Sequence, residues 1–143
     1  MIAIGSDHGG FELKEELKAH LEQRGIEYID VGCYSPESCD YPGIAKDLCG
    51  KITDRKCELG ILICGTGIGM SIAANKIKGI RAAVCGDCFS AKATRQHNNA
   101  NVLCIGARVT GAGLALQIAD IFIDTPFSND ERHVRRISQI EDL

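Results

Sequence analysis

The stretch Leu59-Gly-Ile-Leu-Ile-Cys-Gly-Thr-Gly-Ile-Gly69 decides the fold, because a short apolar run in it passes directly into a glycine-rich turn. The run over residues 59–64 has the length and composition of a strand buried on both faces. Glycine then occupies alternate positions from Gly65 to Gly69, and a helical pattern over residues 70–77 follows the turn. A buried strand, a tight turn and a helix are the repeating unit of a parallel α/β sheet.

The same unit recurs on both sides of this stretch. Apolar runs that predict strands cover residues 1–4, 26–31, 59–64, 80–85 and 102–106. Apolar spacing that predicts helices covers residues 11–24, 44–52, 70–77, 89–97, 111–119 and 129–140. We therefore expect an α/β fold, a Rossmann-like three-layer sandwich with a five-stranded parallel sheet, in a single domain over residues 1–143.

Composition excludes several classes of protein. The chain has 143 residues, of which 45% are hydrophobic and 24% charged, as in a globular domain and unlike a disordered chain. The formal net charge is only -3 and tryptophan is absent, so a nucleic-acid partner is disfavoured. No apolar run approaches the ~20 residues of a membrane helix, and the apolar start is too short for a signal peptide. We expect a cytoplasmic protein with neither a nucleic-acid nor a membrane partner.

The eight cysteines lie largely inside apolar stretches, which favours reduced thiols over a disulfide framework. Cys49, Cys57 and Cys104 are most simply small apolar core residues. Cys85 and Cys88 have the C-x-x-C spacing of redox and zinc sites. A structural zinc site needs four ligands, and the chain has no second pair of this kind. We expect no metal site, and a redox or metal-binding protein built on Cys85 and Cys88 remains an alternative.

Two glycine-rich loops follow strands of the predicted sheet, over residues 5–10 and 65–69. Ligands bind at the carboxyl ends of strands in such sheets, so both loops are candidate site segments. The backbone N–H groups of a glycine turn at a helix start also stabilise negative charge. The dinucleotide fingerprint G-x-G-x-x-G is broken by Met70, although Asp87 lies near the distance expected for a ribose-binding acid. A nucleotide-binding module and a plain structural turn remain alternatives to an anion-binding turn.

Cys64 differs from the other cysteines by its position at a strand end, immediately before the glycine turn. The N–H dipoles of the turn favour its thiolate over its thiol. Most buried cysteines have no such neighbours and serve only as apolar side chains. The position therefore makes Cys64 a candidate base or nucleophile.

Titratable and cationic residues flank these loops. Asp7 and His8 lie in the first loop and His97 ends a predicted helix, where histidine suits acid–base chemistry near neutral pH. Capping of a helix by Asp7, and a favourable interaction of His97 with a helix dipole, are the structural alternatives. Arg132 and Arg136 lie four residues apart on one helical face. They form either a two-pronged clamp for a phosphate dianion or a solvated charged face.

Four motifs stand in order along the chain: Gly5-Ser-Asp-His-Gly-Gly10, Cys64-Gly-Thr-Gly-Ile-Gly69, Arg95-Gln-His-Asn-Asn-Ala-Asn-Val102 and Arg132-His-Val-Arg-Arg136. Together they closely resemble the ribose-5-phosphate isomerase B family of sugar-phosphate isomerases, which also contains the galactose-6-phosphate isomerase subunits. The resemblance covers essentially the whole chain. It implies an aldose–ketose isomerase that interconverts ribose 5-phosphate and ribulose 5-phosphate through a cis-enediolate, without a metal or other cofactor.

The resemblance implies catalytic roles for four residues. Cys64 matches the base that moves a proton between the second and first carbons of the sugar. Some relatives use a Glu at the position of Met70 instead, and Met70 cannot be a base, so Cys64 is expected to serve. Thr66 and Asp7 are implied to assist sugar binding, and His97 to open the furanose ring.

The resemblance also implies a set of substrate-binding residues. Backbone N–H groups of the turn face the enediolate oxygens, basic side chains hold the phosphate, and an amide binds a sugar hydroxyl. The N–H donors of the turn are Gly65, Gly67, Ile68 and Gly69. The residues that hold the phosphate are His8, Arg108, Arg132 and Arg136, and the amide is that of Asn98. Allose 6-phosphate, galactose 6-phosphate and free rare sugars stay open as substrates, because a modest change of pocket admits another hydroxyl-bearing carbon.

The expected position of His97 predicts a shared site. Its helix starts at the carboxyl ends of the strands and rises ~1.5 Å per residue, so His97 lies roughly 12 Å nearer the opposite edge of the sheet. Within one subunit it therefore points away from Cys64. We expect a homodimer, or a dimer of such dimers, in which each subunit lends His97 to the glycine turn of its partner.

Overall fold

Five parallel strands form the central sheet, in the order β2-β1-β3-β5-β4. The computed structural model describes residues 1–143. Its strands are β1 (Ile2–Ser6), β2 (Tyr28–Asp30), β3 (Leu59–Cys64), β4 (Ala82–Val84) and β5 (Val102–Gly106). Every pairing is parallel, and β3 lies at the centre between β1 and β5. The predicted five-stranded parallel sheet is confirmed.

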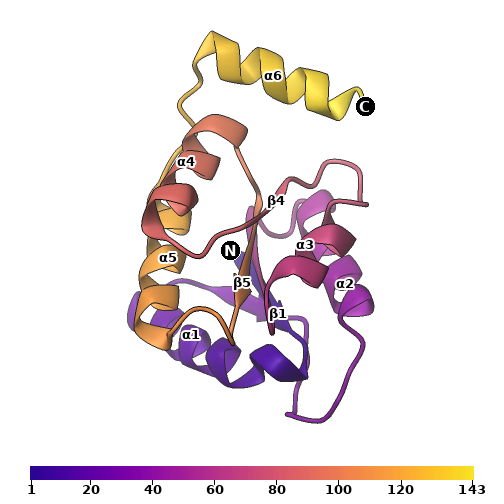
Figure 1. Ribbon diagram of the computed structural model, residues 1–143, viewed down its shortest axis with the longest axis vertical. Coiled ribbons are helices and arrows are strands. Elements are labelled where there is room, and N and C mark those ends of the chain that lie inside the picture. The colour runs from indigo at the N-terminus through magenta and orange to yellow at the C-terminus, as the bar shows by residue number, and fades with distance from the viewer.

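Helices cover both faces of the sheet and complete the three layers (Figure 1). One face packs against α1 (Phe11–Gln23), α4 (Cys88–Asn98) and α5 (Ala112–Asp124), and the other against α2 (Tyr41–Thr53) and α3 (Ile68–Ala74). The first interface has an apolar core of 16 buried residues and the second a core of 12. The Rossmann-like three-layer sandwich is therefore confirmed.

The helices begin at different residues from those predicted where proline or glycine shapes the first turn. α2 begins at Tyr41 rather than at residue 44, because Pro42 suits the first turn of a helix. α3 begins at Ile68 rather than at residue 70, because Gly67, with a φ of 78°, completes the turn just before it. A short 3-10 helix, η1 (His8–Gly10), is not evident from the apolar pattern.

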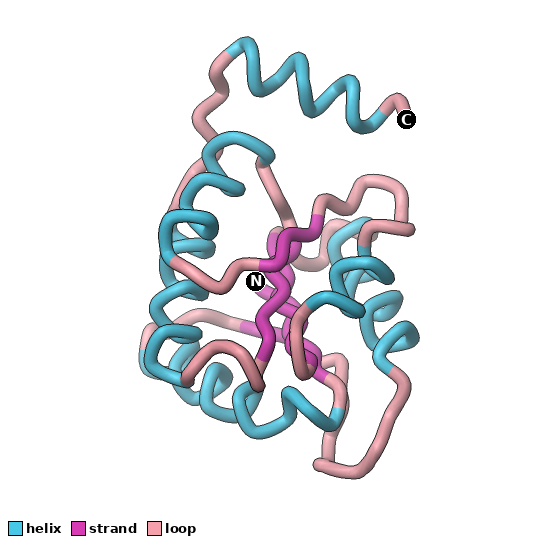
Figure 2. The backbone as a smooth tube through the Cα atoms, viewed as in Figure 1, coloured by secondary structure: helices cyan, strands magenta, loops and turns pink.

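The last helix, α6 (Glu131–Glu141), stands apart from the three layers. Figure 1 and Figure 2 show it beyond one end of α4, with the C-terminus of the chain at its far end. His133 is its only buried residue, so α6 contributes little to either apolar core. No helix of the protein, α6 included, has the length and apolar character needed to cross a membrane.

Candidate active site

The carboxyl ends of β1 and β3 lie side by side, which brings the two glycine-rich loops together. In the strand register Ser6 pairs with Ile63, and the Asp7 N–H donates to the Ile63 carbonyl at 3.1 Å. Gly10 lets η1 lie directly on this strand end, since a Cβ there would sit 2.6 Å from the Ile63 carbonyl oxygen. The two loops therefore meet at one edge of the sheet, as the sequence predicts.

Cys64 is the last residue of β3 and is 5% exposed. Its Sγ accepts a hydrogen bond from the Gly67 N–H at 3.1 Å. Only glycine suits position 67, because φ is 78° there and a Cβ would lie 3.0 Å from the Ile105 carbonyl carbon. The predicted N–H dipole is thus aimed at the sulfur, where it stabilises negative charge.

The other buried cysteines lie in surroundings that keep their thiols protonated. Burial raises the pKa of Cys49 to about 11, and burial followed by the charge of Asp87 raises the pKa of Cys85 to about 11. Burial likewise raises the pKa of Cys57 and Cys104. These side chains pack as small apolar groups in the two cores. No three His, Cys, Asp or Glu side chains converge as metal ligands anywhere in the structure.

Asp7 and His8 lie in the loop that meets the Cys64 turn. Asp7 Oδ1 accepts hydrogen bonds from the N–H groups of Gly9 and Gly10 at 2.9 and 3.2 Å, so its capping role is confirmed. The exposed His8 accepts a hydrogen bond at Nδ1 from the Cys39 N–H at 3.3 Å. That bond places the proton of a neutral His8 ring on Nε2, which is left as a donor for an external group.

Arg108 reaches the same edge from the segment after β5. Its N–H donates to the Gly65 carbonyl at 3.0 Å. Its guanidinium lies against both loops, since a Cβ on Gly65 would be 3.4 Å from Nη1 and a Cβ on Gly9 would be 3.7 Å from Nη2. A permanent positive charge beside both loops favours an anion there.

Two side chains border the glycine turn. Thr66 is exposed, and its Oγ1 accepts a hydrogen bond from the Ile68 N–H at 3.2 Å, so the side chain predicted to assist sugar binding is fixed against the turn. Tyr41, which the sequence reasoning missed, lies against Gly69, where a Cβ would sit 3.0 Å from the phenol oxygen. Its only signal in the sequence is a Tyr-Pro pair, which suits the first turn of a helix. Met70 is fully buried in the core and leaves no acid at that position.

A second group of predicted residues lies at the end of α4 and on α6. His97 is exposed on the last turn of α4, and its ring centroid lies 4.6 Å from that of His133. His133 is buried; its Nδ1 lies 3.1 Å from Ser128 Oγ, and its Nε2 accepts a hydrogen bond from Arg132 Nε at 3.3 Å. Burial, followed by the charges of His97 and Arg132, lowers the pKa of His133, which favours the neutral ring.

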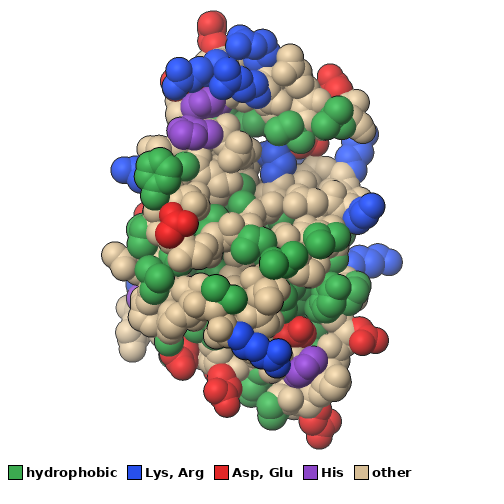
Figure 3. All heavy atoms as spheres, in the orientation of Figure 1, with side chains coloured by type: hydrophobic (Ala, Val, Ile, Leu, Met, Phe, Trp, Pro, Cys, Tyr) green, Lys and Arg blue, Asp and Glu red, His purple; other side chains and the backbone are tan.

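The structure does not bring the two groups together within one subunit. The loop after Asn98 leads into the amino end of β5, whereas Cys64 lies at the carboxyl end of the neighbouring β3. The length of β5 separates them by roughly 13 Å at ~3.3 Å per residue. Figure 3 shows histidine and cationic side chains at both ends of one face, with apolar side chains between them.

The predicted site is therefore divided into two half-sites. The turn half-site is the edge around Cys64, with its glycine turn and the side chains of Asp7, His8, Thr66 and Arg108. The helix half-site consists of the exposed side chains of His97, Asn98, Arg132 and Arg136. Sequence reasoning found both sets but missed His133, whose buried ring supports two members of the second.

A cysteine that accepts a hydrogen bond from a glycine turn, with histidines and arginines on exposed surfaces nearby in the fold, is the set of groups that the sequence predicts for an enzyme of phosphorylated sugars. The profile of the Ribose/Galactose Isomerase family matches residues 2–140. The chain belongs to this family and is a sugar-phosphate isomerase.

Relatives with known names cover nearly the whole chain. Ribose-5-phosphate isomerase B of Escherichia coli strain K12 is 48% identical over 139 residues, which is 97% of this chain and 93% of the relative. D-erythrulose-4-phosphate isomerase of Pectobacterium atrosepticum is 46% identical over 128 residues, or 88% of this chain and 84% of the relative. The crystal structure of a ribose 5-phosphate isomerase from Thermotoga maritima is 51% identical with a TM-score of 0.97, covering 99% of this chain and 97% of that one.

Proposed function

We propose that the protein interconverts ribose 5-phosphate and ribulose 5-phosphate through a cis-enediolate. The observation that carries the proposal is the 3.1 Å hydrogen bond from the Gly67 N–H to Cys64 Sγ. It gives the turn a stabilised thiolate to serve as the base and a preorganised donor beside it. The names of the Escherichia coli and Thermotoga maritima relatives support the same substrate.

Cys64 is the base of the proposed reaction. Its thiolate takes the proton from the second carbon of the open-chain aldose, and the C–H electron pair forms the C1–C2 double bond while O1 becomes negative. A proton then moves from O2 to O1 across the cis-enediolate. Cys64 returns its proton to C1, which leaves a carbonyl at C2 and restores the thiolate. No redox partner is needed, because the proton and electron pair stay within the substrate and the thiol.

The glycine turn and its neighbours stabilise the enediolate. Once Cys64 carries the proton, its sulfur is no longer negative. The Gly67 N–H can then donate to the negative oxygen of the enediolate. The N–H groups of Gly65, Ile68 and Gly69 complete the set of donors. Thr66 and Asp7 hold the sugar hydroxyls, and His8 and Arg108 place positive or N–H groups toward the phosphate.

The helix half-site supplies the remaining functions from a second subunit. His97 opens the furanose ring, Asn98 binds a sugar hydroxyl, and Arg132 and Arg136 bind the phosphate. Support for a homodimer comes from exposed apolar side chains on the edge strand β4 and the elements around it. Their exposed fractions are 81% for Phe89, 71% for Val109, 60% for Ile72, 54% for Ile68 and 43% for Val84.

Several sugars could undergo the same proposed reaction, so the preferred substrate is a separate question. Allose 6-phosphate, galactose 6-phosphate and unphosphorylated rare sugars are candidates because they share the reacting aldehyde and neighbouring hydroxyl. The relative named D-erythrulose-4-phosphate isomerase adds a tetrose phosphate to the candidates. Parallel assays of the purified protein on these sugars and on ribose 5-phosphate rank them, and we expect the highest kcat/KM for ribose 5-phosphate.

Mixing two inactive variants tests both the base and the shared site. Cys64→Ser loses about a hundred- to ten-thousandfold in kcat, because a hydroxyl without an activating partner is a much weaker base. His97→Ala loses ring opening. When the two variants exchange subunits, each mixed dimer has one site with both residues intact and recovers activity.

A matched pair of controls makes the mixing experiment decisive. Cys88→Ser changes a partly exposed cysteine outside the turn and keeps wild-type activity. Subunit exchange is verified with a mass-tagged variant. Near-normal turnover by Cys64→Ser would contradict the role of the base, and verified exchange without recovered activity would contradict the shared site.

A further inference from the structure

Arg81 lies beside the helix half-site but belongs to none of the sequence motifs. It precedes β4 at the amino edge of the sheet, and its backbone N–H donates to Asn101 Oδ1 at 2.8 Å. Its guanidinium, on a side chain 20% exposed, donates to the carbonyl oxygens of Asn98 and Asn99, both at 3.0 Å. A helix leaves such C-terminal carbonyls without backbone partners and slightly negative. Arg81 therefore fixes the end of α4, where His97 lies.

The same guanidinium also holds α6. Its Nη1 donates to Glu141 Oε1 at 2.6 Å, in the last turn of that helix. No other ion pair or side-chain hydrogen bond joins α6 to the three layers of the protein. The opposite end of α6 is held by the contact between the rings of His133 and His97. Both ends of α6 are thus tied to the end of α4.

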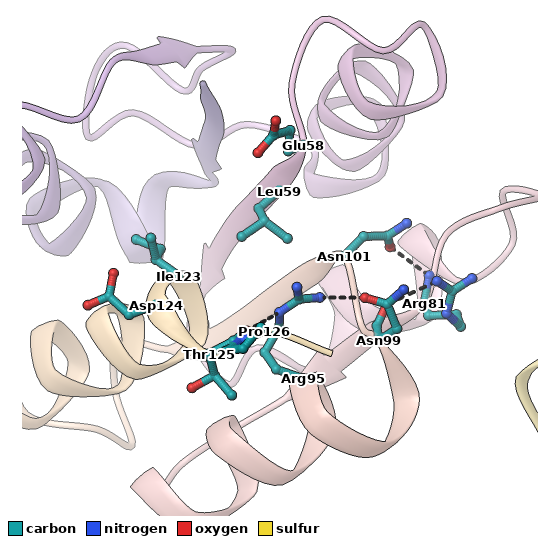
Figure 4. Close-up of a pocket in the computed structure, with 10 residues that line it drawn as sticks. All are labelled: Glu58, Leu59, Arg81, Arg95, Asn99, Asn101, Ile123, Asp124, Thr125 and Pro126. Carbon is teal, nitrogen blue, oxygen red and sulfur yellow. Dashed lines mark hydrogen bonds between the residues drawn. The ribbon is translucent and has the colours of Figure 1, made fainter. Parts of the chain in front are cut away.

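Arg95 supports the end of α4 from another side but does not reach α6. Its Nη1 donates to Asn99 Oδ1 at 3.0 Å and to the Ala100 carbonyl, and its Nε donates to the Thr125 carbonyl at 3.2 Å. Figure 4 shows both arginines with their amide partners around a polar hollow of about 420 Å³. Arg95 thus fastens the segment after α4 to the end of α5. Arg81 is the one of the two that couples α4 to α6.

We propose that Arg81 is a positioning residue of the isomerase, which fixes His97 and Asn98 on α4 relative to Arg132 and Arg136 on α6. The inference rests on the proposed function, in which the first pair acts on the sugar ring and the second on its phosphate. Both pairs act on one substrate molecule, so the length of the sugar dictates their separation. Arg81 contacts the end of α4, which carries the first pair, and Glu141 of α6, the helix that carries the second pair. In this proposal it does not itself bind the substrate.

Loss of this contact has a predictable kinetic signature. A displacement of ~1 Å of a catalytic group costs on the order of a hundredfold in rate, so Arg81→Ala lowers kcat/KM for ribose 5-phosphate roughly ten- to a hundredfold. Part of the loss is in kcat, because His97 no longer meets the ring oxygen. The rest is in KM, because Arg132 and Arg136 no longer meet the phosphate together.

A comparison of two substrates separates positioning from general damage. Ribulose 5-phosphate cannot close a furanose ring, because its fifth oxygen carries the phosphate, so exchange of its C1 hydrogen in D₂O needs Cys64 but no ring opening. We measure this exchange and the isomerisation of ribose 5-phosphate, each at saturating substrate. Arg81→Ala lowers the isomerisation rate at least about fivefold more than the exchange rate. A merely structural defect at the turn would lower both rates equally.

Three further variants serve as comparisons. Glu141→Ala removes the partner of Arg81 on α6 alone, so it raises KM for both substrates and leaves the ratio of the two rates unchanged. Arg81→Lys keeps the charge but not the forked geometry, and its rates lie between those of Arg81→Ala and wild type. Arg24→Ala is the matched control, since Arg24 joins α1 to α5 through Asp120 and Asp124 at 2.7 and 2.8 Å, and keeps both rates at wild-type values.

Hydrogen–deuterium exchange gives a readout that does not depend on activity. In Arg81→Ala the backbone amides of residues 98–101 and 131–141 exchange faster than in wild type and in Arg24→Ala. Unchanged protection of these segments, or an unchanged ratio of the two rates, would overturn the role of Arg81. If the wild-type protein failed to isomerise ribose 5-phosphate, the proposed function would fall. The exchange data would still show whether Arg81 holds the two segments together.

Discussion

The turn half-site and the helix half-site are held in place by different means. Around Cys64 the main chain sets every position, through a central strand, the left-handed backbone of Gly67 and the close approach of Gly10 to β3. On α6 the positions depend on side chains near the surface, namely the ion pair of Arg81 with Glu141 and a contact between two histidine rings. The first arrangement is part of the core, and the second is added outside it.

The difference matches the role that we propose for each half-site. Proton transfer needs the base and the oxyanion donors placed to a fraction of an ångström, and buried main chain provides that rigidity. Phosphate binding relies on long arginine side chains, which accommodate small shifts. We therefore expect changes in the turn half-site to alter kcat and stability together. Changes at the two arginines of the helix half-site should alter KM with little effect on stability.

Gly67→Ala is the strongest single test of this difference. The substitution forces a Cβ into a backbone with a φ of 78°, 3.0 Å from the Ile105 carbonyl carbon. We expect a loss of about 1–3 kcal/mol in the free energy of unfolding from backbone strain. Displacement of the N–H that faces Cys64 should lower kcat about a hundredfold. Thermal denaturation and steady-state kinetics measure the two effects.

Gly113→Ala is the matched control for Gly67→Ala. Gly113 lies in α5, where a Cβ would meet no atom within 4 Å and φ is not positive. We expect alanine there to stabilise the helix by about 0.5–1 kcal/mol with kcat unchanged. If Gly67→Ala matched this control in both stability and kcat, the main chain would not be what positions the turn half-site.

Arg136→Ala tests the helix half-site and should have a smaller effect, confined to substrate binding. Removal of one charge-assisted hydrogen bond worth about 1.5–3 kcal/mol raises KM for a phosphorylated sugar roughly ten- to a hundredfold. Arg132→Ala should behave similarly. Both side chains are exposed, so the melting temperature should stay at the wild-type value.

Arg135→Ala is the natural control, because Arg135 is exposed on the same helix but lies outside the spacing of the other two arginines. It should leave KM for ribose 5-phosphate unchanged. Unphosphorylated ribose serves as the second control, since the arginines have no phosphate to bind on it. An equal rise in KM for ribose and ribose 5-phosphate would argue against a phosphate role for Arg136.

The sequence predicts the turn half-site better than the supports of the helix half-site. Strand β3, the glycine turn and Cys64 are contiguous, so their relative placement follows from local backbone geometry. The contact of Tyr41 with Gly69 and the ion pair of Arg81 with Glu141 join segments far apart in the chain. Such contacts depend on how whole helices pack, and no spacing rule along the sequence contains that information.

The boundaries of the strands are also predicted better at the centre of the sheet than at its edge. The centre of the sheet is predicted correctly, because β3 and β5 are apolar runs buried on both faces. β4 covers only Ala82–Val84, shorter than the predicted 80–85, because it is an edge strand paired on one side. An apolar run alone does not reveal how many of its residues will find a pairing partner.

The smallest expected effect concerns pH and the buried ring of His133. Burial, followed by the charges of His97 and Arg132, lowers the pKa of His133 in the folded protein below that of an unfolded histidine, about 6.5. The unfolded chain therefore binds a proton at this residue more readily, so the contribution of His133 to stability is complete above pH ~6.5 and falls as the pH drops further. We expect the melting temperature of the wild-type protein to fall more between pH 7 and pH 5 than that of His133→Gln. The two proteins share every other titratable group, so the difference between their curves isolates this ring.

Protonation of His133 should also weaken substrate binding at the helix half-site. A protonated His133 repels the Arg132 guanidinium, whose Nε–H it accepts when neutral, and weakens the contact with His97 that holds the start of α6. KM for ribose 5-phosphate should therefore rise in the wild type once the pH has fallen far enough below the ordinary histidine pKa of ~6.5 for the folded protein to protonate His133. In His133→Gln the rise should be smaller, because the amide stays neutral across this pH range. If KM varied with pH in the same way in wild type and His133→Gln, α6 would keep its position regardless of the charge on this histidine. The ion pair of Arg81 with Glu141 would then be sufficient to hold α6.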